Sequence, residues 1–107
     1  MKKLEIIIKP EKLEDLKAVL ESSEVNGLNI VNSMGYGNQK GIIKNYRGAS
    51  YNVTLLPKIK VETVVPGLID KVVDEINTGN FGDGKIFVYD VEDAVRIRTG
   101  EHGDKAL

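Results

Sequence analysis

The sequence predicts a single α+β domain, and three observations support this. Short runs of β-branched residues alternate with amphipathic stretches, in the order strand, helix, strand, and then again strand, helix, strand. A length of 107 residues fits one domain over 1–107. A hydrophobic fraction of 41% and a charged fraction of 29% are typical of a globular chain. We therefore expect one sheet with helices packed against it.

The first half of the chain reads as a strand, a helix and a second strand. Residues 2–9 are rich in Ile and stop at Pro10, which suits the first turn of a helix. Between 12 and 20 the apolar residues recur at helical spacing, and the Asn-Gly pair at 26–27 predicts a left-handed stop. The apolar stripe consists of Leu13, Leu16, Val19 and Leu20. A second strand is expected over 28–34.

A long loop follows, at about residues 36–55. It is rich in Gly and Tyr and has little sustained periodicity. Loops of this length are uncommon in compact domains and usually have a function. We expect part of the loop to pair as a hairpin with an exposed, mobile tip.

The second half repeats this order. Residues 58–65 alternate between polar and apolar types as a strand does, and residues 68–76 carry a short helical stripe. A glycine-rich turn at about 78–85 leads into a strand over 86–91. The element order predicts a ferredoxin-like (βαββαβ) sandwich, in which an antiparallel sheet carries both helices on one face. The chain ends in a C-terminal segment of about 96–107. We expect a short strand over 95–101, which leads into this segment, and a frayed end.

Composition excludes several classes of protein. A net charge of −1 argues against a broad basic face for nucleic acid. No apolar run reaches the roughly 18 residues of a membrane span, and Pro10 comes too early for a signal-peptide core. Without Cys and with one His, thiol chemistry is excluded and a zinc site or a Ser-His-Asp triad is hard to build. We expect a cytoplasmic protein that oligomerises, because so small a domain is marginal alone.

The glycine-rich turn is a candidate phosphate site. The sequence Thr78-Gly79-Asn80-Phe81-Gly82-Asp83-Gly84-Lys85 allows a tight turn whose backbone N–H groups can face an anion. Lys85 adds a positive charge, although the spacing is not that of a Walker A loop. A plain turn between a helix and a strand is an equally good interpretation.

A second candidate phosphate site is the pair Arg96 and Arg98. At alternate positions of an extended segment, both guanidinium groups point to the same side, and their planar forks suit phosphate oxygens. An exposed, charged strand edge is the alternative interpretation. Glu62 is either a half-buried, paired carboxylate or an outward-facing one, and His102 is expected to have no specific role.

The beginning of the long loop is a third candidate site. Glycines at positions 35, 37 and 41 would allow close approach of a ligand to the backbone, and Gln39 and Lys40 would supply polar contacts. The alternative is a flexible loop base. Lys58 is ordinarily a solvated strand residue, while Ser50 and Tyr51 are either exposed contact residues or modification sites.

Short motifs along the whole chain carry a family resemblance. They are Ile8-Lys9-Pro10, Gly35-Tyr36-Gly37, Gln39-Lys40-Gly41, Tyr46-Arg47-Gly48, Leu56-Pro57-Lys58, Gly82-Asp83-Gly84-Lys85-Ile86-Phe87-Val88 and Arg96-Ile97-Arg98-Thr99-Gly100-Glu101. The last two are highly specific. On these motifs the chain resembles the PII nitrogen-regulatory signal-transduction proteins from end to end.

The resemblance implies a non-enzymatic regulator that forms a homotrimer, with nucleotide sites in the clefts between subunits. It implies competitive binding of ATP and ADP, and binding of 2-oxoglutarate together with Mg²⁺-ATP. The long loop would then dock onto ammonium transporters or onto enzymes and regulators of nitrogen metabolism. A sensor of adenine nucleotides that answers to a different metabolite is the main alternative. A weak nucleotide hydrolase and a ferredoxin-like RNA binder are further ones.

The same resemblance implies roles for individual residues. Those implied for nucleotide binding are Ile7, Asn29, Gly35, Gly37, Asn38, Glu62, Val64, Gly82, Asp83, Gly84, Lys85, Arg96, Ile97 and Arg98. Those implied for 2-oxoglutarate are Gln39, Lys40, Gly41, Lys58 and Gly82, with Gln39 also holding Mg²⁺. Tyr51 matches a tyrosine that is uridylylated in some members.

The chain departs from the family pattern in three places. Asn38 stands where many members have Arg, and Ala49-Ser50 replaces the more usual pair before Tyr51. The stretch between Pro66 and Thr78 is about five residues shorter than usual, and losing about four residues removes one helical turn while keeping the apolar face in phase. We therefore expect a shortened second helix and the same fold.

Overall fold

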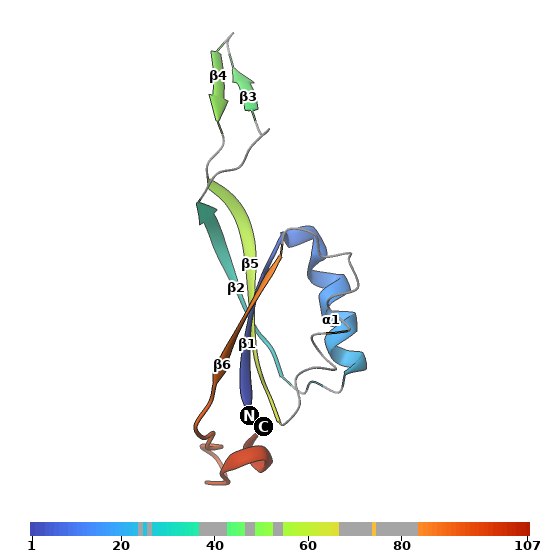
Figure 1. Cartoon of the computed structure of the whole chain (residues 1–107), viewed down its shortest axis with the longest axis vertical. Helices are drawn as coiled ribbons and strands as arrows, with labels where there is room; N and C mark the ends of the chain where they lie inside the picture. Colours follow the sequence, from blue (N-terminus) through green and yellow to red (C-terminus); the bar gives the residue numbers. More distant parts are fainter. Residues whose placement is uncertain are drawn as a thin grey trace.

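The computed structural model describes residues 1–23, 25, 27–36, 43–46, 49–52, 55–66, 74 and 84–107. Figure 1 shows the arrangement of the elements. The strands are β1 (Lys2–Ile8), β2 (Asn29–Tyr36), β3 (Ile43–Tyr46), β4 (Ala49–Asn52), β5 (Leu55–Val65) and β6 (Lys85–Asp90). The helices are α1 (Leu13–Ser22) and two 3-10 helices, η1 (Pro10–Lys12) and η2 (Gly103–Ala106).

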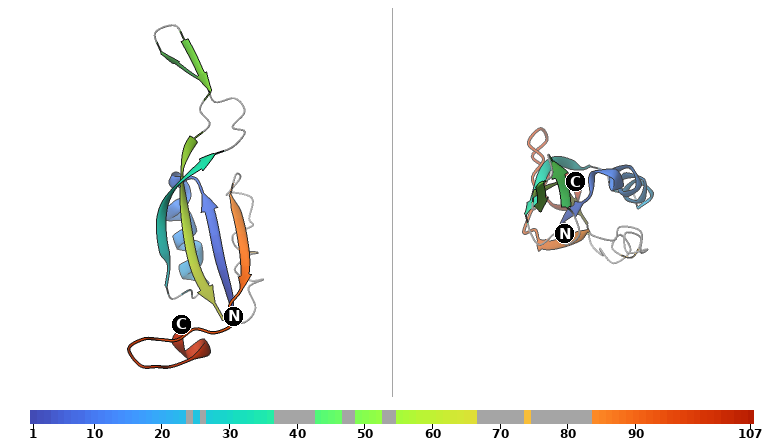
Figure 2. Two further views of the ribbon diagram at one scale, coloured as in Figure 1. Left: turned by 90° about the vertical axis from the view of Figure 1, so that its left-hand side faces the viewer. Right: turned by 90° about the horizontal axis from the view of Figure 1, so that it is seen from above.

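The four longest strands form one antiparallel sheet in the order β2-β5-β1-β6. The strands β1 and β2, which α1 connects, are not neighbours, because β5 lies between them. This split order is that of the ferredoxin-like fold, so the predicted fold class is confirmed. In the left view of Figure 2 the sheet faces the viewer and α1 lies behind it.

A hydrophobic core fills the space between the sheet and α1. Side chains alternate between the two faces of a strand, so every second residue of β1 and β5 points toward α1. In register, Ile6 lies opposite Val61 and Ile8 lies opposite Ile59. The buried hydrophobic residues are Leu4, Ile6, Ile8, Leu16, Leu20, Ile59, Val61 and Val65. Leu16 and Leu20 stand one turn apart on α1, as the predicted stripe requires.

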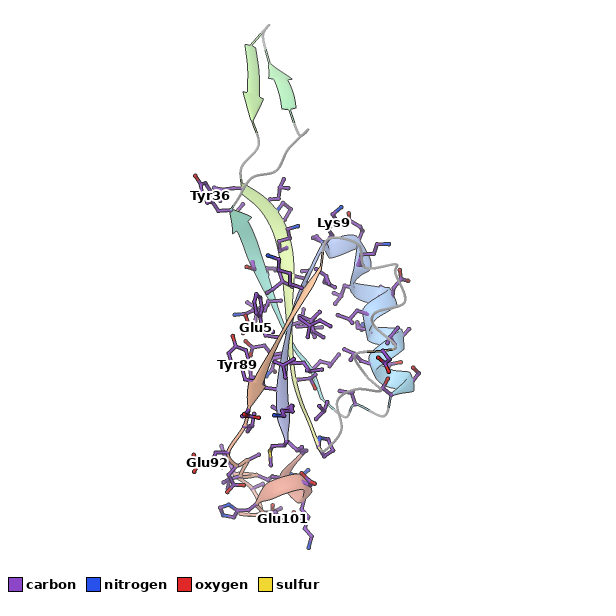
Figure 3. The ribbon with its side chains drawn as sticks, in the orientation of Figure 1. Glu5, Lys9, Tyr36, Tyr89, Glu92 and Glu101 are labelled. Carbon is purple, nitrogen blue, oxygen red and sulfur yellow. The ribbon has the colours of Figure 1, made fainter. Side chains whose placement is uncertain are left out.

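We refer to the face of the sheet away from α1 as the open face. Its residues are Lys3, Glu5 and Ile7 on β1, Lys58, Lys60, Glu62 and Val64 on β5, Asn29, Val31 and Ser33 on β2, and Lys85, Phe87 and Tyr89 on β6. Figure 3 shows Glu5 and Tyr89 on this side of the sheet. Polar and apolar side chains are mixed there, and none of the described helices covers them.

The beginning of α1 follows the prediction, whereas its end does not. Pro10 occupies the first turn of η1, which leads into α1. The helix ends at Ser22, and beyond it the Val25 N–H donates a 3.1 Å hydrogen bond to the Leu20 carbonyl. Gly27 does not adopt the predicted left-handed conformation; among the described glycines only Gly100 and Gly103 have positive φ. Asn26 lies outside the described residues.

The long loop contains a two-stranded hairpin, as predicted. Strands β3 and β4 pair antiparallel, with Ile43 opposite Asn52 and Tyr46 opposite Ala49. Figure 1 shows this hairpin beyond the ends of β2 and β5. The strand β5 begins at Leu55 rather than at 58, because β2 continues to Tyr36 and pairs with Leu55. The tip is predicted to be exposed and mobile, but the residues that join β3 to β4, 47–48, lie outside the described residues.

Part of the second half lies outside the described residues. This applies to the helix predicted over 68–76, apart from Asp74, which is helical, and to the glycine-rich turn up to residue 83. The shortening predicted for that helix therefore stays a prediction. In the part of the chain that is described, no helix is long and apolar enough to cross a membrane.

The C-terminal segment differs from its prediction. Residues 97–99 form a turn, and Val95 makes a single bridge to His102 in place of a strand. Gly100, at a φ of 74°, closes the turn by donating its N–H to the Arg96 carbonyl at 2.7 Å. The last residues form η2 and are not frayed into an extended tail. The predicted strand is wrong because Gly100 turns the chain back on itself.

The buried position of Leu16 leads to a stability prediction. Its side chain is fully buried between α1 and the sheet. We expect Leu16→Ala to lower the free energy of unfolding by about 2–5 kcal/mol, because a core Leu→Ala change loses apolar burial and leaves a cavity. Glu21→Ala, on the exposed side of α1, should change it by no more than about 0.5 kcal/mol. Urea unfolding at matched protein concentration measures both, and equal effects would contradict the packing described.

Candidate ligand-binding site

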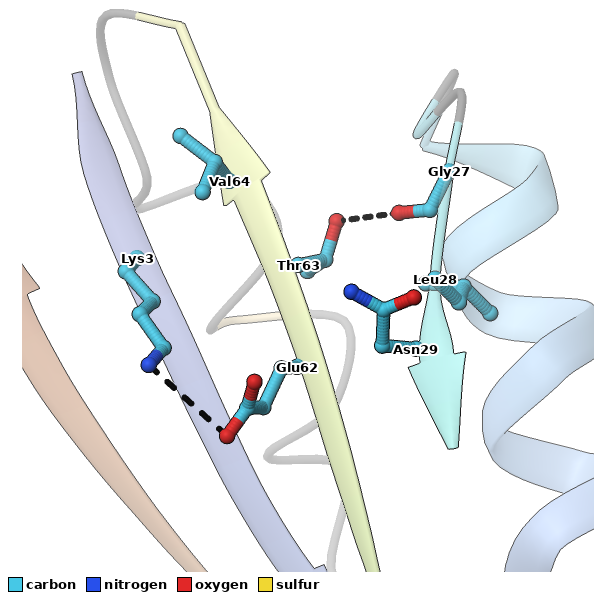
Figure 4. A pocket seen from close by; sticks show the side chains of 7 residues that line it. All are labelled: Lys3, Gly27, Leu28, Asn29, Glu62, Thr63 and Val64. Atoms are coloured by element: carbon cyan, nitrogen blue, oxygen red, sulfur yellow. Dashed lines mark hydrogen bonds and ion pairs between the residues drawn. The ribbon is translucent and has the colours of Figure 1, made fainter. Parts of the chain in front are cut away.

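A pocket of about 280 Å³ lies where the end of β5 meets the start of β2. Figure 4 shows the residues that line it. They are Lys3, Gly27, Leu28, Asn29, Glu62, Thr63 and Val64. The register explains why they meet, because Asn29 is the first residue of β2 to pair with β5 and lies opposite Glu62. Lys3, from β1, lies opposite Val64 on the other side of β5.

Glu62 is a half-buried carboxylate held between two lysines. Its Oε1 lies 3.7 Å from the Lys3 Nζ and 3.6 Å from the Lys60 Nζ. Its side chain is 27% exposed. The register also places Glu5 directly opposite Glu62. Like charges at such a position repel one another, so the two lysines are needed to balance them. Of the two interpretations of Glu62, the paired one is correct.

Lys3 connects the Glu62 carboxylate to β6. Its Nζ lies 5.4 Å from the centre of the Tyr89 ring, within the range of a cation–π contact. The Tyr89 hydroxyl in turn lies 3.4 Å from Oε2 of Glu5. Charged and aromatic groups from β1, β5 and β6 therefore form one polar network beside the pocket.

Thr63 forms the inner wall of the pocket. Its side chain is 5% exposed, and its hydroxyl donates to the Gly27 carbonyl at 2.7 Å. The Asn29 side chain is exposed beside it, as Figure 4 shows. An amide can both donate and accept hydrogen bonds, so Asn29 offers a planar ligand both functions next to the apolar Val64.

Several predicted site residues come together on the open face. Asn29, Glu62 and Val64 line the pocket. Ile7 lies opposite Lys85 of β6, and Gly84 directly precedes that strand. The predicted residues Gly37, Asn38, Gln39, Lys40, Gly41, Gly82 and Asp83 lie outside the described residues, and of Tyr51 and Ser50 only their place in β4 is described.

Gly35 and Lys58 approach each other closely on the neighbouring strands β2 and β5. A Cβ at position 35 would lie 3.2 Å from Cγ and 3.3 Å from Cε of Lys58. Such contacts are tighter than ordinary van der Waals distances, so a side chain at position 35 would displace the stem of Lys58. The glycine therefore leaves room for Lys58 along this strand.

The two arginines do not lie as predicted. Because residues 97–99 form a turn, Arg96 and Arg98 are not on one side of an extended segment. Arg96 donates from Nη2 to the carbonyl of Leu107 at 3.1 Å, and Ile97 is 99% exposed. Among the described residues, no hydrogen bond or ion pair joins either arginine to the pocket of the same chain.

His102 has a structural role that the sequence analysis missed. Its Nδ1 lies 2.7 Å from Oδ2 of Asp93, while Oδ1 of Asp93 accepts hydrogen bonds from the N–H groups of Ala94 and Gly103. The hydrogen bond with His102, followed by that with Ala94, lowers the pKa of Asp93 below its ordinary value. The expectation of no specific role is therefore wrong. The glycines at 100 and 103, which both have positive φ, were the feature of the sequence that could have indicated a folded turn around His102.

Fold and pocket together define a small ferredoxin-like α+β protein with a polar pocket between two sheet strands and a hairpin beyond the sheet. A family model described as Nitrogen regulatory protein P-II matches residues 1–101. The chain is 49% identical to the nitrogen regulatory protein P-II of Haemophilus influenzae and 46% identical to that of Rhodospirillum rubrum. It is 48% identical to nitrogen regulatory protein P-II 1 of Escherichia coli.

Each of these alignments covers 100% of this chain and 100% of the relative. The chain therefore belongs to the P-II family of nitrogen regulatory proteins. The resemblance inferred from its motifs is confirmed.

The Asp93 carboxylate leads to a prediction about pH. Its pKa is held below the ordinary 3.8, so folding favours its ionised form. That stabilisation is present above the pKa of the unfolded chain and is lost as pH falls through the lowered value. We expect the N–H groups of Ala94 and Gly103 to lose protection from exchange in this acid range.

Asp93→Asn is the matched control, because it keeps an oxygen acceptor and does not titrate. NMR of the two amides against pH measures the effect in both proteins. The same acid transition in wild type and Asp93→Asn would contradict a role for this carboxylate.

Proposed function

We propose that this protein is a nitrogen-regulatory signal protein without enzymatic function. In this proposal it binds ATP or ADP and, together with Mg²⁺-ATP, 2-oxoglutarate, and it controls partner proteins through the loop that contains β3 and β4. The observation that supports it best is the match, over the whole chain, to proteins named nitrogen regulatory protein P-II. The proposed location is the cytoplasm, and the proposed partners are ammonium transporters and nitrogen-metabolism enzymes or regulators.

The pocket suits the base of a nucleotide. Val64, on the open face, provides apolar contact for a flat ring, while Leu28 lines the pocket from the core side. The Asn29 amide can pair with the adjacent donor and acceptor on an adenine edge, as Asn does when it reads adenine. Ile7, Gly35 and Glu62 are proposed to complete this end of the site.

The phosphates are proposed to lie toward the glycine-rich turn. The backbone around Gly82, Asp83 and Gly84 would present N–H groups, and Lys85 would add charge. Arg96 and Arg98, with Ile97 between them, are proposed to reach the phosphates of a neighbouring subunit. The exposure of Ile97 at the tip of this turn supports an outward-facing position, and planar guanidinium forks suit phosphate oxygens.

The 2-oxoglutarate site is proposed at the base of the long loop. Gln39 would hold Mg²⁺ with the ATP phosphates, and Lys58 would pair with a carboxylate of the dicarboxylic acid. Lys40, Gly41 and the backbone at Gly82 would complete the site. The close approach of Gly35 to the stem of Lys58 supports a fixed position for this lysine. Loop control would be a population shift, limited by how much the ligand prefers one loop state.

A homotrimer is proposed, with the open faces of three sheets turned inward. Val31, Phe87 and Tyr89 are each close to half exposed on this face. Exposed apolar residues that gather on one face of a sheet are typical of an interface. A small domain also gains much from such burial, because it buries comparatively little of its surface alone.

Calorimetric titration tests the ligand proposal. We expect 2-oxoglutarate to bind only in the presence of Mg²⁺-ATP. Lys58→Ala should weaken 2-oxoglutarate binding by about tenfold or more, because a charged hydrogen bond contributes about 1.5–3 kcal/mol, while ATP binding stays unchanged. Lys17→Ala, on α1, is the control.

Binding of 2-oxoglutarate without ATP, or unchanged binding in Lys58→Ala, would contradict this assignment. If ATP binds and 2-oxoglutarate does not, the protein senses a different metabolite. If neither ATP nor ADP binds, the proposed function is wrong.

Sedimentation equilibrium tests the trimer. We expect a mass of three times the monomer mass of 11.8 kDa. Phe87→Glu should shift the protein toward monomer, because it would bury a charge opposite Glu5. Phe87→Leu should remain trimeric, and circular dichroism would confirm that both variants are folded. A monomeric wild-type protein would exclude this assembly.

A further inference from the structure

Thr63 is a polar residue in an otherwise aliphatic row. The residues of β5 that point toward α1 are Ile59, Val61, Thr63 and Val65. The hydroxyl of Thr63 is almost fully buried, at 5% exposure of the residue. A buried hydroxyl is costly unless it forms a hydrogen bond. Val would fill the same space without that cost. The hydrogen bond to Gly27 is therefore the feature that distinguishes Thr from Val at this position.

The Thr63–Gly27 hydrogen bond holds backbone that the sheet does not hold. The pairing of β2 with β5 begins at Asn29, opposite Glu62. Gly27 and Leu28 precede that first pair and form one side of the pocket. The Thr63 hydroxyl lies beyond this pair of β2 and β5 and donates a 2.7 Å hydrogen bond to the Gly27 carbonyl (Figure 4).

Among the described residues, the Thr63 hydroxyl is the hydrogen-bond partner found for Gly27. A Cβ built at position 27 would meet no described atom within 4 Å, and the residue is exposed. Leu28 is partly buried and packs against the core. Without the bond from Thr63, the Gly27 carbonyl would lose this partner, and the backbone that leads into Asn29 would be less restrained.

We propose that Thr63 is a positioning residue, which fixes the Gly27–Asn29 wall and so holds the Asn29 amide in place for a purine base. The proposal rests on the nucleotide binding proposed above. Thr63 itself need not touch the ligand. Its contribution is preorganisation. If the Gly27–Asn29 wall is ordered before the ligand arrives, binding loses less conformational entropy.

Two substitutions separate the hydroxyl from the space it fills. Thr63→Val keeps the shape and removes the donor, while Thr63→Ser keeps the donor and removes a methyl group. We expect Thr63→Val to weaken ATP binding about tenfold, in line with one lost hydrogen bond. Thr63→Ser should bind within about threefold of wild type, although it loses core volume.

The matched control is Ser22→Ala. Ser22 also donates a 2.7 Å hydrogen bond to a backbone carbonyl, that of Val19, but at the end of α1 and outside the pocket. Ser22→Ala should leave ATP binding unchanged. Calorimetry with ATP and Mg²⁺ measures all four proteins, and hydrogen exchange of the Leu28 and Asn29 amides reports on the wall in the absence of nucleotide.

The expected result combines three observations. In Thr63→Val, ATP binding weakens and the Leu28 and Asn29 amides lose protection, while the melting temperature stays close to wild type. In Thr63→Ser, both ATP binding and protection return. Because Ser is the more disruptive change for packing, this order of affinities would not arise from a general effect on stability.

Three results would overturn the proposal. Wild-type ATP affinity in Thr63→Val would show that the hydroxyl does not position the site. Failure of Thr63→Ser to restore binding, or a loss of affinity that follows the melting temperature across the variants, would assign Thr63 to packing alone. If the wild-type protein binds no ATP, the proposed function itself fails and the positioning role fails with it.

Discussion

The pairing of β5 with a neighbour on each side is the constraint on which the rest of the structure depends. Within this strand of 11 residues, alternate side chains serve two different environments. Ile59 and Val61 enter the core, while Lys60 and Glu62 stay on the open face. A slip of one residue would exchange the two sets and place charges against α1. The register of the whole sheet is therefore set by the cost of burying those charges.

The same register builds the polar site. It sets Glu5 opposite Glu62 and brings Lys3 and Lys60 to the latter carboxylate. Most of the pocket is thus assembled on paired strands, while Gly27 and Leu28 precede the first pair and Gly27 is joined to β5 by the Thr63 hydroxyl. The hairpin of β3 and β4 lies beyond the sheet, so a rigid site and an extended segment occupy two ends of the same long strands. This division suits a protein in which a ligand signal would pass to partners.

The sequence predicted the elements whose residues interact locally or repeat with a clear period. The alternation in β5 and the stripe with Leu16 and Leu20 were sufficient for both elements, and the order of all the elements predicted the fold class. Prediction failed at the ends of elements. The pair Arg96 and Arg98 alternates as in a strand, yet Gly100 turns the chain there, and Asp93 and His102 hold the turn across nine residues. At the end of α1, a backbone bond from Val25 replaced the stop expected at Gly27.

By itself, the sequence determined the fold class, the hydrophobic faces of α1 and β5, and membership of the P-II family, because these depend on period and on contiguous motifs. Only the tertiary structure decided that Glu62 is paired, that Thr63 holds Gly27, and which residues line the pocket. Thr63 and Gly27 are 36 positions apart. No local pattern encodes such a contact, because it exists only once β2, β5 and β1 have aligned in a single register.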